Sequence, residues 1–123
     1  MKMKAIDIIR KVDELEPNQF GADKKLAWLS ELDGQIYLEL SRVYEPCMSQ
    51  PGRYVTGEEE LLVEEPYAQG VYSHFLQAMM AAENYETGKY NQHITLFDSA
   101  YRQYANSVTR THTHTGTGKT FLF

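Results

Sequence analysis

The sequence predicts a mainly α fold with about four helices, a small β hairpin and an extended C-terminal tail. In four stretches of the chain, apolar residues recur every three or four positions, which is the spacing of amphipathic helices. A segment with prolines and glycines interrupts this pattern, and from Thr109 threonine occupies every second position. The 123 residues suit one domain. We therefore expect a helical domain over residues 1–106 with an inserted loop at 44–65, followed by an extended arm at 107–123.

The first expected helix covers residues 4–15. Ile6, Ile9 and Val12 lie at helical spacing, and charged residues occupy the other side. Pro17 ends this helix, because proline disfavours a helical backbone at the residue before it.

The second expected helix begins near Asp23, a residue type favoured at helix N-caps. Leu29, Ile36 and Leu40 repeat on one of its faces. Gly34 lies inside the pattern, where glycine costs up to about 1 kcal/mol relative to alanine. Gly34 either marks a close approach between two helices or is a tolerated imperfection of the helix, and of these we favour the close approach.

The middle segment loses the helical pattern. Residues 53–56 and 61–63 are expected to form two short strands around a turn at Gly57, giving a loose hairpin. An isolated hairpin is marginally stable in water, so this one needs support from the helices or from another subunit.

Two further helices are expected to form an antiparallel hairpin. Pro66 suits the first turn of the third helix, and the apolar spacing continues to Tyr85. Thr87–Gly88 supplies the break, and the fourth helix begins near Tyr90. The short connection makes the two helices antiparallel.

The arm at 107–123 has the period-two pattern of an extended strand, and it ends in an apolar tip. An unpaired strand edge can join the sheet of a partner, and an apolar tip can fill a pocket on that partner. The residues expected to bind a partner are Thr109, Thr111, Thr113, Thr115, Phe121, Leu122 and Phe123.

The formal net charge of −5 argues against non-specific DNA binding. After Asp98 the only charged residues are Arg102, Arg110 and Lys119, so the end of the chain is locally basic. Cys47 is the one cysteine, which excludes a disulfide within the chain and a C-x-x-C motif. No apolar run approaches the roughly 20 residues needed to cross a bilayer, and we expect an intracellular protein.

Two motifs near the end of the chain resemble functional sites. Gly116–Thr120 looks like a phosphate loop, but Thr113 stands where that motif needs a glycine and no helix follows, so we exclude a nucleotide site. His112 and His114 would project from one side of a strand. A closed zinc site needs about four ligands, and no cysteine or carboxylate lies near these histidines in sequence. We expect no metal, no cofactor and no catalytic residue.

A glutamate cluster flanks the apolar residues 61–63. It allows three interpretations: a cation site, a solvated loop, or an acidic lining that repels DNA in a channel. The candidate channel-lining residues are Glu58, Glu59, Glu60, Glu64 and Glu65. His74 and His93 lie on the expected third and fourth helices without a visible partner.

Three groups of residues, in this order, resemble the small head-tail connector (adaptor, head-completion) proteins of tailed phages and prophages of Gram-positive hosts. The first group is Pro17–Phe20 with Trp28–Tyr37, the second is Leu61–Val63, Pro66–Tyr67 and the helix Tyr72–Ala82, and the third is Tyr90–Asn91, Leu96–Phe97 and Ala100–Tyr101. Together they cover most of the chain from Val12 to Tyr104. The residues from Thr109 onward match nothing in this resemblance.

The resemblance implies a structural protein of the virion, made in the cytoplasm of the bacterial host. Such proteins form an oligomeric ring, commonly of twelve copies, beneath the portal protein of the capsid. The ring continues the DNA channel, through which DNA passes without sequence-specific binding, and presents a surface to the tail or a tail-completion protein. Neither a membrane nor catalysis is involved.

Two alternatives remain open from the residues alone. The chain could be a small helical binding or regulatory module outside any virion, which predicts a stable monomer or dimer with a dispensable tail. It could also be a metal-dependent enzyme that uses the histidines, which predicts stoichiometric metal that His112→Ala and His114→Ala abolish.

Overall fold

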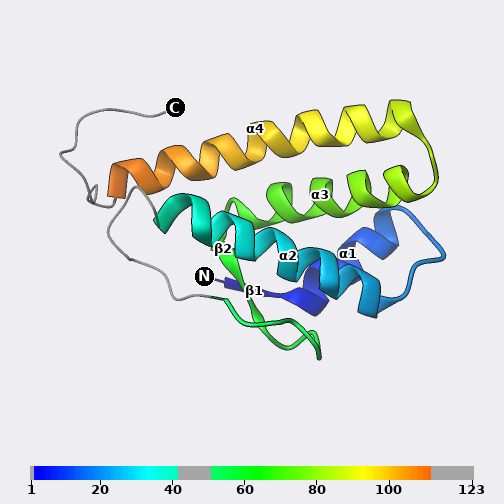
Figure 1. The fold of residues 1–123 in the computed structure, drawn as a ribbon, viewed down its shortest axis with the longest axis horizontal. Helices are drawn as coiled ribbons and strands as arrows, with labels where there is room; N and C mark the ends of the chain where they lie inside the picture. Colours follow the sequence, from blue (N-terminus) through cyan, green and yellow to red (C-terminus); the bar gives the residue numbers. More distant parts are fainter. Residues whose placement is uncertain (1, 42–50, 112–123) are drawn as a thin grey trace.

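The computed structural model describes residues 2–41 and 51–111 (Figure 1). Along the chain, the elements are β1 (Lys2–Lys4), α1 (Ala5–Leu15), α2 (Ala22–Ser41), β2 (Glu60–Glu64), α3 (Ala68–Glu83) and α4 (Thr87–Thr111). The predicted mainly helical class with about four helices is confirmed, and the described residues also contain a two-stranded antiparallel sheet. None of the helices in these two segments is long and apolar enough to cross a membrane.

Helix α3 lies at the centre of the molecule. It contacts α1, α2, α4 and β2, and α4 runs antiparallel along it (Figure 1). Val71, Tyr72, Leu76 and Met80 of α3 are fully or almost fully buried. The sequence allows this position because the apolar residues of α3 are not confined to one narrow stripe, whereas α1 has the single apolar face of a surface helix.

The strand pairing differs from the predicted hairpin. β2 pairs with β1, with Lys2 opposite Glu64 and Lys4 opposite Glu60, while residues 53–56 form no strand. The physical reason lies in Glu59, whose carboxylate accepts hydrogen bonds from the backbone N–H groups of residues 55, 56 and 57. Backbone donors that are used in this turn are not available for a strand ladder.

The turn is fixed to α1 as well. Gly57 has a φ of 91°, a conformation that glycine adopts readily, and its carbonyl accepts a hydrogen bond of 2.8 Å from the Ile6 N–H. A Cβ atom at Gly57 would lie 3.1 Å from the Ile6 Cβ. Residues 2–6 and 57–64 therefore pack together as one corner of the fold.

The connection between α1 and α2 is stabilised by a buried lysine. Lys25 is 1% exposed, and its Nζ lies 2.6 Å from Asp13 Oδ1 and 2.9 Å from the Phe20 carbonyl oxygen. The Asn18 side chain accepts a hydrogen bond from the Phe20 N–H. The Pro17–Asn18 turn predicted from the sequence is thus stabilised by two side chains: Asn18 binds the Phe20 N–H, and Lys25 binds the Phe20 carbonyl.

The connection between α3 and α4 comes earlier than predicted. Helix α3 begins at Ala68, two residues after Pro66, and α4 begins at Thr87, so Thr87–Gly88 lies inside α4. The break occurs at Asn84–Glu86, where Tyr85 adopts a positive φ of 59°. The sequence-based prediction relied on glycine as the helix terminator, but here a tyrosine takes the left-handed conformation.

Helix α4 also extends further than predicted, because residues 107–111 are helical rather than extended. Val108 is buried in the core, and the Thr109 hydroxyl donates a hydrogen bond to the Ala105 carbonyl, one helical turn earlier. Burial of Val108 and this hydroxyl bond favour the helix over the period-two strand pattern. Residues 112–123 of the predicted arm lie outside the described residues.

Gly34 and Gly70, which both lie inside helices, have different surroundings. A Cβ at Gly34 would meet nothing within 4 Å, so the predicted close helix approach at Gly34 is wrong. At Gly70 of α3 a Cβ would lie 3.2 Å from the Ala100 Cβ of α4. The close approach belongs to the α3–α4 pair.

Candidate functional site

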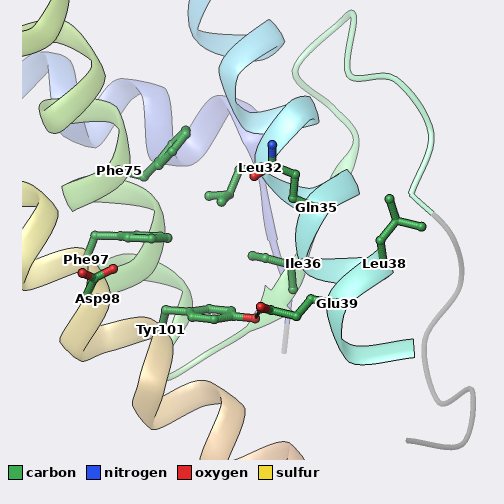
Figure 2. A pocket seen from close by; sticks show the side chains of 9 residues that line it. All are labelled: Leu32, Gln35, Ile36, Leu38, Glu39, Phe75, Phe97, Asp98 and Tyr101. Carbon is green, nitrogen blue, oxygen red and sulfur yellow. Dashed lines mark hydrogen bonds between the residues drawn. The ribbon is translucent and has the colours of Figure 1, made fainter. Parts of the chain in front are cut away.

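An open groove lies between α2 and α4, with α3 contributing to its lining (Figure 2). The groove has a volume of about 460 Å³. Its apolar lining consists of Leu32, Ile36 and Leu38 of α2, Phe75 of α3, and Phe97 and Tyr101 of α4. We call these six residues, with the polar residues at their edge, the α2–α4 groove.

The aromatic side of the α2–α4 groove is a row of three rings. The Phe75 and Phe97 ring centroids are 5.5 Å apart, and the Phe97 and Tyr101 rings are stacked with centroids 6.0 Å apart. These distances are typical of aromatic pairs that hold one another in place. The row therefore presents a preformed apolar surface rather than a set of independent side chains.

The edge of the α2–α4 groove is polar and acidic. Gln35, Glu39 and Asp98 complete its lining, and the Tyr101 hydroxyl donates a hydrogen bond to Glu39, which links α4 to α2 (Figure 2). Leu38, by contrast, is 57% exposed although it is apolar. The groove thus combines an apolar floor with two carboxylates at its rim.

Helix α2 also carries a buried carboxylate, that of Asp33, which does not line the groove. Asp33 is 0% exposed and accepts hydrogen bonds of 2.6 Å from each of the Tyr54 and Tyr72 hydroxyls and of 3.0 Å from the Leu62 N–H. The Tyr72 hydroxyl in turn accepts a bond of 2.8 Å from the Val63 N–H. These bonds join α2, the loop before β2, β2 itself and α3.

Burial raises the pKa of Asp33, and the hydrogen bonds from the two tyrosines and Leu62 oppose this shift. Desolvation and the neighbouring Asp33 charge raise the pKa of both tyrosines. The cluster stabilises the fold, because each carboxylate oxygen is already bound to donors and Asp33 has no contact with solvent.

The structure brings together two histidines that the sequence left without partners. His74 of α3 and His93 of α4 stack with ring centroids 5.6 Å apart, and their Nδ1 atoms are 3.4 Å apart. Burial, followed by the neighbouring His93, lowers the pKa of His74. The sequence could have suggested this pair, because in an antiparallel helix hairpin two residues at similar distances from the turn lie side by side.

Among the residues that the structure describes, the histidine pair has no third ligand. Within residues 2–41 and 51–111, no group of three or more histidine, cysteine, aspartate or glutamate side chains could hold a metal ion. His112 and His114 lie outside this part of the chain. The two stacked rings pack α3 against α4.

Each candidate channel-lining glutamate lies opposite, or binds, a nearby residue of the fold. Glu58 forms an ion pair of 2.9 Å with Lys4, and Glu60 and Glu64 lie opposite lysines in the β1–β2 pair. Three backbone hydrogen bonds lower the pKa of Glu59 to about 2, and Glu65 accepts a bond from Gln69. The acidic cluster is thus partly neutralised by β1, which the sequence did not suggest because the two segments are far apart in the chain.

The predicted partner-binding residues separate into two groups. Thr109 and Thr111 belong to α4. Thr113, Thr115, Phe121, Leu122 and Phe123 lie outside the described residues. Sequence reasoning did not identify the α2–α4 groove, because its residues come from three helices and only tertiary packing brings them to one place.

Comparison with known proteins gives no relative: no protein-family model, no curated protein and no solved structure matches this chain.

Proposed function

We propose that this protein is a structural head-tail adaptor of a tailed phage or prophage, which forms a ring between portal and tail and continues the DNA channel. The α2–α4 groove is the observation that carries this proposal. It is a preformed apolar surface with an acidic rim, and surfaces of this kind are typical of contacts with other proteins.

Further apolar side chains are exposed outside the groove floor. Tyr85, at the turn between α3 and α4, is 92% exposed, and Leu96 of α4 is also exposed. A single exposed apolar residue has no special meaning. Leu38 and Leu96 lie on the two helices that border the groove, and Tyr85 lies at the turn of the α3–α4 hairpin. Exposed apolar side chains on separate elements support contacts with several neighbouring subunits, as a ring requires.

The buried charged groups serve the fold. Asp33 and Lys25 are both bound by internal partners that join separate segments. An adaptor needs a rigid body that holds its contact surfaces in place, and these bonds supply that rigidity. The resemblance of residues 12–104 to head-tail connectors adds the particular role and the location in a virion.

The α2–α4 groove also supports a second candidate, a small helical binding or regulatory module. The two candidates differ in assembly, because a module is expected to remain a monomer or dimer when portal protein is present.

The test uses the full chain with its portal protein, examined by electron microscopy and native mass spectrometry. We expect rings on the portal. Leu38→Lys should reduce their number, because it places a charge in the apolar groove, whereas Val55→Lys should not. Val55 is a matched control, since it is similarly exposed at 62% but lies outside the groove. A chain that stays monomeric beside portal, while particles without it mature normally, would contradict the proposal.

A further inference from the structure

We propose that the α2–α4 groove binds residues 119–123 of a neighbouring copy of this chain, so that each subunit holds the tail of the next. This inference rests on the proposed function, because it names the partner that occupies the groove in a ring.

The chemistry of the two surfaces is matched. The groove offers an apolar floor with a row of three aromatic rings, and the tail offers Phe121, Leu122 and Phe123 in succession. A volume of about 460 Å³ falls within the range of about 300–1,000 Å³ of pockets that enclose compact ligands. Burying two phenylalanines and a leucine is the kind of contact that dominates binding energy.

The charges are complementary as well. Glu39 and Asp98 stand at the groove edge, and Lys119 lies two residues before Phe121. No acidic residue follows Asp98 in the sequence, whereas the chain as a whole carries a net charge of −5. A basic tail and an acidic body attract each other between copies, and the lysine at the rim fixes the direction of the docked segment.

The length of the tail permits the contact. Helix α4 ends at Thr111, and seven residues separate it from Lys119, which span at most about 25 Å when extended. The groove residues Phe97 and Tyr101 lie 10 to 14 positions before Thr111, which is about 15–21 Å along a helix. A tail of this length reaches a groove on its own subunit or on one packed directly beside it.

We assign the groove to the neighbouring copy because of what a ring requires. When the tail of one copy binds the groove of the next, the contact is head-to-tail, and head-to-tail contacts between identical copies form a ring wherever the rotation from copy to copy closes. A tail in the groove of its own subunit would use both surfaces without joining any copies.

Disulfide cross-linking tests the assignment on the full chain with Cys47→Ser. One variant carries Leu38→Cys in the groove and Thr120→Cys in the tail. On oxidation we expect a ladder of covalent oligomers on a non-reducing gel. Val55→Cys with Thr120→Cys is the matched control, and it should give little ladder. A cross-linked monomer without a ladder, or equal ladders from both variants, would overturn the inference.

Charge reversal provides a second, independent measurement. Asp98→Lys should lower the yield of the ladder, and Lys119→Asp added to Asp98→Lys should restore it. Phe121→Ser should abolish it, because the apolar contact is lost. Asp98 is exposed on α4, and circular dichroism checks that each variant retains its helices. An unchanged yield in Asp98→Lys and Phe121→Ser would also overturn the inference.

The two proposals fail in different ways. Rings on the portal without a groove–tail cross-link would leave the adaptor function standing and reject the tail as the occupant. A specific ladder from a chain that never binds portal would support the groove–tail contact and reject the head-tail assignment.

Discussion

Asp33 joins more segments of the chain than any other side chain described above. Its two oxygens accept bonds from Tyr54, Tyr72 and the Leu62 N–H, all in a region closed to solvent. A buried donor that loses its acceptor cannot turn to water, so the carboxylate is expected to matter more for stability than a surface ion pair.

We predict that Asp33→Ala strongly destabilises the fold, by about 1–3 kcal/mol for each buried donor left unpaired. Asp33→Asn should cost less, because it preserves the volume and one acceptor oxygen. Urea denaturation followed by circular dichroism measures both values. Equal stability of Asp33→Ala and the native chain would show that the donors find other partners.

The histidine pair makes stability depend on pH. Burial and His93 lower the pKa of His74 from its ordinary value of 6.5. The unfolded chain therefore binds a proton more readily than the folded chain. The contribution of His74 to stability is complete above pH 6.5 and is lost as the pH falls through and below that value.

We predict that His74→Gln flattens this part of the pH profile, because glutamine does not titrate. The measurement is the midpoint of urea unfolding at a series of pH values, compared between variant and native chain. Identical profiles for native chain and His74→Gln would contradict the prediction.

At the scale of elements, Gly34 and Gly70 show how different the physical settings of helical glycines are. Gly34 of α2 has space around it, whereas Gly70 of α3 faces Ala100 of α4 at a distance that leaves no room without adjustment. Glycine inside a helix costs stability through its conformational freedom. At Gly70 this cost is offset, because the missing side chain lets α3 and α4 pack closely, whereas Gly34 allows no such contact.

We predict that Gly34→Ala stabilises the chain by up to about 1 kcal/mol, the difference in helix propensity. Gly70→Ala is the matched comparison, and it should gain less or destabilise, because its methyl group pushes α3 away from α4. Thermal unfolding of both variants measures the difference. A larger gain at Gly70 would show that the two helices separate easily.

At the scale of the whole molecule, the α3–α4 hairpin and α2 create a surface that no single element carries. The groove depends on α2 and α4 both packing against α3. The groove has an acidic rim, and every charged side chain that follows Asp98 in the sequence is basic.

We predict that self-association of the full chain weakens as salt rises, because the Debye length falls from about 10 Å at 0.1 M to about 3 Å at 1 M. Analytical ultracentrifugation at the two salt concentrations measures this. Asp98→Lys should reduce the salt dependence by removing one attractive pair. Association that strengthens with salt would indicate a purely apolar contact.

The sequence by itself determined the helical elements and the class of the fold. Apolar spacing identified the first two helices to within a few residues, because burial of one face imposes that period on any surface helix. Helix ends were less accurate: Tyr85 took the role expected of glycine, and Val108 extended α4 into a segment with a strand-like pattern.

Only the tertiary structure decided which distant segments meet. Strand β2 pairs with the first residues of the chain, Asp33 lies against two tyrosines from other segments, and the α2–α4 groove draws residues from three helices. Local periodicity records which face of an element is buried, but not which element buries it. That choice depends on how all the apolar faces are covered at once, which is a property of the packed molecule.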